Sequence, residues 1–401
     1  MNKIKNLCCL LILVVFIGCR HNKNIKQVRY AYLEKLNSDY KFNSEINYYF
    51  NQTKDVGMAA TDFSFVSEHQ NLINCLISSD STKRISAKTL SEIENQYEEV
   101  NAKKYIIEKS KEHEFLLINE AHFIPQHRNF LSDLLPQLYE AGYRNHALEG
   151  LGNSTLIESA IAENGYPELY HGYYPKEPEF GNLIRKAHHL GFNIFGYDGG
   201  SGEDREITGA KNILEKVESF AKKGKTIVLC GWDHIKEGPT ETYWEYALAG
   251  RLKELSGTDP LTINQTQYYE RANRMFEDSL YQALHFTEPT VLINNLNESI
   301  DLESNKDWYD VFVFHPRTVF TEGVPNWILK EKILKEFEIP MVDITFPYKI
   351  LVFEKEDNIE KAVPTYIIEL SAAKKKINIP VYPNRDYKIL LANKEIAFLI
   401  E

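Results

Sequence analysis

The pattern of hydrophobic and polar residues changes near residue 112. Residues 29–111 read mostly as helix, since the stretch from Ser91 to Glu112 contains no Gly or Pro and is rich in helix formers. From residue 112 to about residue 334, short apolar runs alternate with segments whose apolar residues recur at helical spacing. This alternation predicts an α/β domain with a mainly parallel sheet flanked by helices.

The elements of the predicted α/β domain can be assigned from these runs. The expected strands are residues 114–119, 144–150, 192–199, 225–234, 289–295 and 310–317. The expected helices are residues 126–141, 182–190, 203–223 and a helix between 264 and 285. Gly142, Gly191 and Gly224 follow the first three helices, at the position where a glycine often ends a helix. Pro136 lies inside the first helix and is expected to kink it.

Beyond residue 335 the alternation stops. Short strand-like runs, separated by Pro, Asn and charged residues, occupy residues 347–355, 365–371, 375–383, 387–393 and 395–401. These runs predict a small antiparallel β-rich module over residues 335–401. The length of 401 residues agrees with one large domain and smaller additions.

The first 18 residues have the pattern of a targeting segment. Two lysines precede an apolar run from Leu7 to Ile17, which is too short to span a bilayer but suits a secretory signal. The run ends in Phe-Ile-Gly-Cys, and a small residue before Cys19 resembles the cleavage box of bacterial lipoproteins. This resemblance implies cleavage before Cys19, acylation of its sulfur and a lipid anchor, with residues 19–28 as a tether. A plain signal peptide or a short anchor is the alternative.

Cysteine content and net charge restrict the function further. Removal of residues 1–18 would take away two cysteines and two lysines and change the net charge from −11 to −13. With Cys19 acylated, only Cys75 and Cys230 would remain, which is too few for a disulfide scaffold. An acidic exported protein is a poor candidate for binding nucleic acid or anionic lipid. We therefore expect a lipid-anchored protein of the bacterial cell envelope with a small-molecule substrate or ligand.

Ionisable side chains follow five of the expected strands. In chain order they are Glu120 and His122, then Glu149, Asp198, Asp233 and His234, and finally His315 and Arg317. Because ligands of open parallel sheets bind beyond the carboxyl ends of the strands, we expect these groups to gather at one edge. Clustered Glu, Asp and His side chains suit acid–base chemistry or a metal site.

Individually, several histidines and acids in this region have simpler explanations. Asp198 could be a turn residue, and His127 is expected to be an exposed histidine in the first turn of a helix. His188 and His189 lie on an expected helix and should face solvent. The repeated placement of ionisable groups after successive strands is what indicates a site.

Four short motifs carry a resemblance to a known superfamily. Residues 119–127 read NEAHFIPQH, and ALEG follows about 25 positions later, which resembles G-E-x-H followed by a second Glu on the next strand. Residues 204–217, DREITGAKNILEKV, resemble an R-E/D segment before M-A-x-N, and LCGWDHI resembles a later strand that ends in His. In this order the motifs resemble the erythromycin esterases and ChaN-like haem-binding lipoproteins, with the TIKI/TraB proteases more distant. The resemblance covers roughly residues 110–320, and Asn119 departs from it by replacing Gly.

The resemblance implies a cleft formed by Glu120, His122, Glu149, Arg205 and His234. His122 would be the general base that activates water, and Glu120 or Glu149 would orient it and favour its protonated form. Arg205 or His234 would stabilise the developing oxyanion. The sequence contains neither G-x-S-x-G nor H-E-x-x-H, which argues against a serine hydrolase and against a zincin.

Two functions of different classes remain open. The first is an exported, lipid-anchored hydrolase that acts on an ester or related bond. The second is a non-catalytic lipoprotein that binds haem or another ligand, since Tyr and His are haem ligands in other proteins. Glu120, His122, Glu149 and His234 could also hold a divalent metal, because carboxylates and imidazoles suit Zn and Mn. The match to the Arg205 segment favours the hydrolase.

Overall fold

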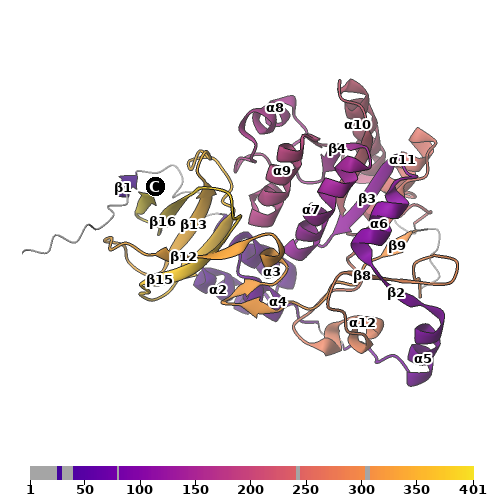
Figure 1. Cartoon of the computed structure of the whole chain (residues 1–401), viewed down its shortest axis with the longest axis horizontal. Coiled ribbons are helices and arrows are strands. Elements are labelled where there is room, and N and C mark those ends of the chain that lie inside the picture. The colour runs from indigo at the N-terminus through magenta and orange to yellow at the C-terminus, as the bar shows by residue number, and fades with distance from the viewer. Residues whose placement is uncertain (1–24, 29–38, 79–80, 241–243, 303–307) are drawn as a thin grey trace, which may run out of the picture.

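The computed structural model describes residues 25–28, 39–78, 81–240, 244–302 and 308–401 (Figure 1). The expected signal segment of residues 1–18 and the expected acylation site Cys19 lie outside the described residues. Within these ranges, none of the helices combines the length and the apolar character needed to cross a membrane.

The centre of the molecule is a six-stranded sheet in which all neighbouring strands are parallel. Its strand order is β5-β4-β6-β3-β7-β9. The strands are β3 (Phe115–Glu120), β4 (Tyr143–Leu148), β5 (Asn193–Gly196), β6 (Lys225–Gly231), β7 (Leu261–Asn264) and β9 (Val311–Phe312). The predicted mainly parallel sheet is confirmed, although β7 was not predicted.

Helices cover both faces of this sheet. Successive residues of a strand point to opposite sides, and both sets are apolar here, so each face needs a covering layer. On one face, Leu116 and Ile118 pack in a core that is covered by α6 (Ala102–Ser110), α7 (Pro125–Glu140), α8 (Thr155–Asn164) and α9 (Pro178–Leu190). On the other face, Phe115 and Leu117 pack with α10 (Arg205–Ser219) and α11 (Leu248–Ser256). Pro136 lies inside α7, and the helix continues beyond it to Glu140. Helix α9 ends before Gly191, which has the left-handed conformation of a helix C-cap, as predicted.

The order of the strands creates a switch point near the middle of the sheet. The chain passes from β3 to β4 and β5 on one side, then returns so that β6 lies between β3 and β4. It continues with β7 and β9 on the opposite side of β3. In open parallel sheets, the crevice at such a switch point is where ligands bind.

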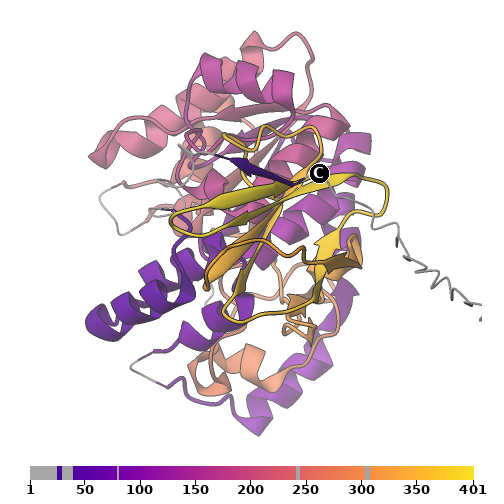
Figure 2. The ribbon, with the colours of Figure 1, turned by 90° about the vertical axis from the view of Figure 1, so that its left-hand side faces the viewer.

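The C-terminal module is antiparallel, as predicted (Figure 2). Its five-stranded sheet has the order β1-β17-β16-β13-β14, with β1 (Ile25–Val28), β13 (Tyr348–Glu354), β14 (Tyr366–Leu370), β16 (Tyr387–Ala392) and β17 (Ala397–Ile400). Beside it, β12 (Ile333–Glu338) pairs with β15 (Lys376–Val381), and β10 (Phe320–Thr321) pairs with β11 (Val324–Pro325).

The N-terminal helices connect the module to the carboxyl edge of the parallel sheet (Figure 1). These helices are α2 (Asn43–Thr53), α3 (Val56–Phe65) and α4 (His69–Cys75). Their apolar residues share one core with Ala121 and Ile124, which follow β3, and with Leu351 and Leu390 of the module. The segment that leaves β3 is therefore supported by parts of the chain far away in sequence.

Some local predictions were wrong because distant segments pair. Residues 29–111 were predicted to be mostly helix, but in the stretch of helical composition from residue 91 to residue 112, β2 (Glu98–Asn101) separates α5 (Ala87–Gln96) from α6. Strand β2 pairs antiparallel with β8 (Thr290–Ile293), so the predicted strand 289–295 lies outside the parallel sheet. The end of the expected tether, Ile25–Val28, is β1, because it pairs with β17.

The helix predicted between residues 264 and 285 is also largely absent. Within that span the structure has a single 3₁₀ turn, η4 (Arg274–Phe276), and the short helix α12 (Ser279–Ala283). Asn273 and Asp278 are the N-caps of these two elements: their side chains accept hydrogen bonds from backbone N–H groups in the first turn. Each element therefore begins separately, and no continuous helix forms. The other 3₁₀ turns are η1 (Tyr174–Lys176), η2 (Gly202–Asp204), η3 (Trp232–Ile235) and η5 (Ile328–Lys330).

Candidate active site

The five residues implied by the motif resemblance all lie at the carboxyl edge of the sheet. Glu120 is the last residue of β3, His122 lies two positions further, and Glu149 directly follows β4. Arg205 begins α10, and His234 lies in η3 after β6. Because β6 lies between β3 and β4, these elements bring the five side chains together around the end of β6.

Glu120 and His122 form a hydrogen-bonded pair. Nδ1 of His122 lies 3.0 Å from Oε1 of Glu120, and 16% of the His122 side chain is exposed while Glu120 is buried. Burial alone would raise the pKa of Glu120, but the Arg128 guanidinium and the hydrogen bond to His122 lower it to about 2. Glu120 is therefore a carboxylate at neutral pH and can accept a hydrogen bond from Nδ1–H of His122.

Two buried residues that were not predicted hold this pair in place. Arg128 of α7 donates from Nε and Nη2 to the two carboxylate oxygens of Glu120, both at 2.6 Å. Its Nη1 donates to Oε2 of Glu177 at 2.9 Å, and Nη2 also donates to the carbonyl oxygen of His122 at 2.7 Å. Glu177 in turn caps the first turn of α9. Neither residue follows a strand or belongs to a recognised motif, so the sequence gives no signal for them.

The second half of the cluster is built on Glu149. Oε1 of Glu149 accepts from Nη2 of Arg205 at 2.7 Å, and Oε2 accepts from the backbone N–H of Gly231. Nε2 of His234 lies 3.0 Å from Nη1 of Arg205. Nδ1 of His234 lies 2.8 Å from Oε2 of Glu206, a residue of the R-E motif that was not among the predicted site residues.

The protonation state of His234 decides which neighbours it binds. In the neutral form, Nδ1–H donates to Glu206 and Nε2 accepts from Arg205. Burial would lower the pKa of His234, but the hydrogen bond to Glu206 and the charge of Glu149 raise it above the ordinary value. When protonated, His234 cannot accept from Arg205, and its Nε2–H would face Oε1 of Glu149 at 3.7 Å. The residue can therefore exchange a proton beside Glu149.

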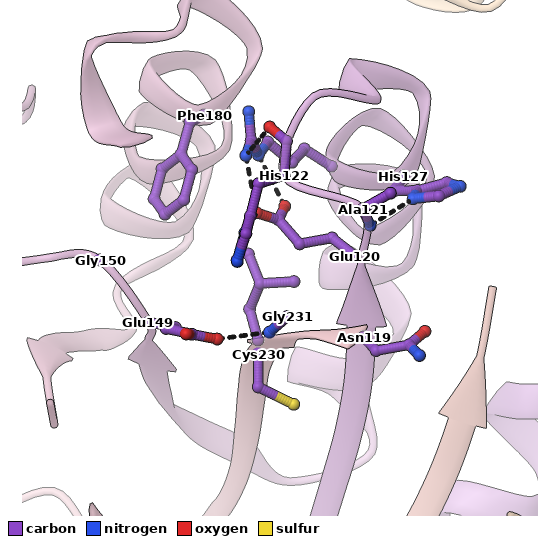
Figure 3. A network of polar contacts seen from close by, with 12 residues as sticks. Asn119, Glu120, Ala121, His122, His127, Glu149, Gly150, Phe180, Cys230 and Gly231 are labelled. Carbon is purple, nitrogen blue, oxygen red and sulfur yellow. Dashed lines mark hydrogen bonds and ion pairs between the residues drawn. The ribbon is translucent and has the colours of Figure 1, made fainter. Parts of the chain in front are cut away.

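Gly231 is the point at which the two halves meet. A Cβ atom at this position would lie closer than 3.0 Å to Cε1 and Nε2 of His122 and 3.3 Å from Oε2 of Glu149. The His122 ring lies above Gly231, with one ring nitrogen directed toward Glu149 and Gly231 (Figure 3). Only a residue without a side chain leaves room for this arrangement.

One aromatic side chain stacks on the His122 ring, and two others belong to residues that follow His122 and Gly231 directly in the chain. Tyr174 of η1 stacks on it, with ring centroids 4.0 Å apart and an angle of 17° between the planes. Trp232 of η3 has a positive φ of 45°, is 38% exposed, and lies 5.7 Å from the Phe123 ring. These residues give the site an apolar, partly exposed border.

Asn119 connects three elements below the site. Its side-chain amide donates to the carbonyl oxygen of Trp232 at 2.8 Å and to Oγ1 of Thr266 at 3.0 Å. Its Oδ1 accepts from the backbone N–H of Gln265 at 2.8 Å. The Asn119 side chain therefore ties the end of β3 to η3 and to the segment that follows β7.

Asp198, after β5, belongs to the cluster. Its Oδ2 accepts from the backbone N–H of Gly150 at 2.8 Å, and its Oδ1 lies 3.5 Å from Nη2 of Arg205. Burial and the negative charge of Glu149 raise the pKa of Asp198.

Other predicted edge residues lie elsewhere. Asp233 is exposed and pairs with Lys236, and Arg317 pairs with Glu277 away from the cluster. His315 is buried, and its Nε2 lies 2.9 Å from Oε1 of Gln265. Of the two residues that follow β9, His315 is thus part of the core and Arg317 is bound by Glu277.

For three histidines outside the site, the sequence analysis had predicted exposure to solvent. His127 was expected to be exposed but is fully buried, because its Nδ1 accepts from the backbone N–H of Ala121 and its ring packs against His315. His188 is half-buried and lies 3.0 Å from the carbonyl oxygen of Ala162, so only part of its side chain faces solvent. His189 is exposed, as predicted.

The residues described by the structure contain no group of three or more His, Cys, Asp or Glu side chains arranged to hold a metal ion. In the candidate cluster, Arg128 binds both oxygens of Glu120. Arg205 and the Gly231 N–H bind the oxygens of Glu149. Each oxygen of these two carboxylates therefore already accepts a hydrogen bond from a donor of the protein.

Comparison with known proteins gives only distant structural likenesses. No family model matches the chain, and no curated protein matches it. The type III effector HopBA1 aligns with 53% of this chain and 91% of its own, at 10% identity and a TM-score of 0.34. RRSP, a MARTX toxin effector domain from Vibrio vulnificus CMCP6, aligns with 51% of this chain and 44% of its own, at 14% identity and a TM-score of 0.30.

A structure of bacterial protein toxins aligns with 56% of this chain and 46% of its own, at 12% identity and a TM-score of 0.29. This chain thus spans less than half of the length of RRSP and of that toxin structure. Likenesses at these TM-scores carry no argument about function.

Proposed function

We propose that this protein is a hydrolase of an ester or related acyl bond, with His122 as the general base. The observation that carries the proposal is the Glu120–His122 pair: a carboxylate holds Nδ1, and the opposite ring nitrogen points toward Glu149 and Gly231 (Figure 3). A carboxylate behind a histidine whose other nitrogen is free to accept a proton is the arrangement that water activation requires.

In the first step, Nε2 of His122 accepts a proton from a water molecule as the water oxygen attacks the carbonyl carbon. The Nδ1–H remains bonded to Glu120, whose negative charge stabilises the imidazolium that forms. Stacking of Tyr174 on the ring holds its plane and favours the cationic form through the aromatic face.

The carbonyl oxygen becomes an oxyanion, and Arg205 is the cation that could stabilise it. Its side chain is 36% exposed, whereas Arg128 is fully buried, so Arg205 can reach a substrate. His234, held by Glu206 beside Arg205, could donate a second hydrogen bond or protonate the leaving group. Salt bridges to Glu149 and Asp198 orient the Arg205 guanidinium.

Activity against a panel of ester and amide substrates tests this proposal. We expect His122→Ala to reduce kcat/KM by about 10²–10⁴-fold. His189→Ala is the matched control, because His189 is an exposed histidine at the end of α9, and it should keep full activity. A His122→Ala variant with wild-type turnover would show that His122 is not the base. If no substrate is turned over and haem binds with a Soret band, the ChaN-like binding function should replace the hydrolase.

We also propose that the mature protein begins at Cys19 and is attached by lipid to a membrane of the bacterial cell envelope. The support is the apolar run that ends in Gly18-Cys19. The net charge of about −13 after cleavage argues against nucleic acid as a partner, and we propose a small molecule as the substrate.

A further inference from the structure

A row of buried charges lies directly behind the Glu120–His122 pair. Glu177, Arg128 and Glu120 have 0%, 0% and 2% of their side chains exposed, and the guanidinium lies between the two carboxylates. The guanidinium also lies 4.9 Å from the centre of the Phe180 ring. Buried charge networks of this kind cost desolvation energy and are often no more stable than apolar residues of the same volume. Stability alone therefore does not account for this network behind the candidate base.

The positive charge of Arg128 decides whether the Glu120 carboxyl group that contacts Nδ1 of His122 is ionised or protonated. A buried carboxyl group without a cation tends to bind a proton, because burial disfavours the charged form. A protonated Glu120 would present an O–H that donates to Nδ1 of His122. The proton of the imidazole would then reside on Nε2, which would have no lone pair to accept a proton from water.

We propose that Arg128 is a positioning residue that sets the tautomer of His122, so that Nδ1 carries the proton and Nε2 is the free acceptor. The functional meaning of this inference rests on the proposed role of His122 as the base. Arg128 acts in two ways: it binds both oxygens of Glu120, and it donates to the carbonyl oxygen of His122 at 2.7 Å. The first contact keeps Glu120 ionised, and the second orients the backbone that carries the imidazole.

Other charged groups around Glu120 do not replace Arg128. Glu149 and Glu177 are acidic and favour protonation of Glu120, and Tyr174 is uncharged at neutral pH. Arg205 binds Glu149 and Asp198 on the other side of the His122 ring. Among the described residues, Arg128 is the Lys or Arg side chain that forms an ion pair with Glu120.

Glu177 has a different part in this network. It accepts from the backbone N–H groups of Glu179 and Phe180 at 2.9 and 2.8 Å, and so joins Arg128 to the start of α9. A glutamine at this position keeps one oxygen that can accept from Arg128 and the Phe180 N–H, but it loses the acceptor for the Glu179 N–H and cannot carry a negative charge. We therefore expect Glu177→Gln to leave the tautomer of His122 unchanged.

Nitrogen NMR of the full chain, labelled with ¹⁵N in histidine only, tests the inference without a substrate. The chain has 12 histidines, and the His122 signals are identified by their loss in His122→Asn. In the wild type and in Glu177→Gln, the proton should be on Nδ1. In the double variant Arg128→Met/Glu177→Gln, which removes the guanidinium together with its second carboxyl partner, the proton should move to Nε2. Hydrolysis by the double variant should fall by about 10²–10⁴-fold, since a catalytic histidine in the wrong tautomer has an effect of this size.

Retention of the Nδ1 proton in the folded double variant would overturn the inference. Arg128→Lys supplies an independent test if the double variant does not fold, because lysine keeps the positive charge. It should keep the Nδ1 proton, and a majority of Nε2–H in this variant would also overturn the inference. A tautomer shift without any hydrolytic activity would leave the role of Arg128 intact and count against the hydrolase. If hydrolysis depends on His122 but the tautomer does not change when Arg128 is replaced, the hydrolase proposal stands and the role of Arg128 is refuted.

Discussion

The substitution Gly231→Ala tests whether His122 and Glu149 meet over the end of β6. The added Cβ would lie closer than 3.0 Å to two atoms of the His122 ring, a separation that real Cβ atoms essentially never show. Ordinary contacts between such atoms lie at about 3.5–4.0 Å, so the ring must move by roughly 1 Å. The movement is resisted by Glu120, which holds Nδ1, and by Tyr174, which stacks on the ring face.

The expected magnitude follows from this overlap. Inserting one methyl group into a packed site costs about 1–3 kcal/mol of unfolding free energy. The same substitution in a His122→Ala background has no ring to displace and should cost less than about 0.5 kcal/mol, apart from the 3.3 Å approach to Glu149. The coupling free energy between positions 231 and 122 should therefore be about 1–2 kcal/mol. A ring displaced by about 1 Å should also reduce activity by about 10²-fold.

Denaturant unfolding of the wild type, both single variants and the double variant measures this coupling. Gly57→Ala is the matched control: this glycine lies in the first turn of α3, and its Cβ would meet only Asp55 Oδ1 at 3.7 Å. It should be neutral or stabilise the protein by up to about 1 kcal/mol. Equal costs of Gly231→Ala in the presence and absence of the His122 side chain would refute the described geometry of the site.

Two further predictions concern pH and lipidation. The pKa of His234 is raised in the folded protein by Glu206 and Glu149 despite burial, so its protonated form stabilises the fold below the unfolded pKa of about 6.5, and this contribution is lost as pH rises through the higher folded value. Unfolding free energies measured from pH 5 to pH 9 should decline less steeply in His234→Gln than in the wild type, and identical slopes would contradict the assignment. Radiolabelled palmitate should enter the full-length protein in a bacterial host but not Cys19→Ser, and label retained by this variant would remove the lipoprotein proposal.

Much of the fold could be predicted because its core strands are buried on both faces. A strand such as β3 must then be apolar along its length, and the helices beside it must be apolar on one side, which leaves a clear pattern in the sequence. The predictions failed where structure depends on partners far away. Strand β2 lies in a stretch with helical composition and exists because it pairs with β8, almost 200 residues later. Strand β1 likewise depends on β17.

The sequence by itself determined that Glu120, Glu149 and His234 would stand at the carboxyl edge of the sheet. Glu120, Glu149 and His234 follow apolar runs directly, and parallel strands must present such positions on the same side. The tertiary structure alone decided which other side chains contact and orient these groups. Arg128 and Glu177 reach the site from α7 and the start of α9, and Tyr174 reaches it from η1, without any local pattern that marks them. The requirement for glycine at position 231 also has no local cause, because the atoms that exclude a side chain there belong to residues about 80 and 110 positions earlier in the chain.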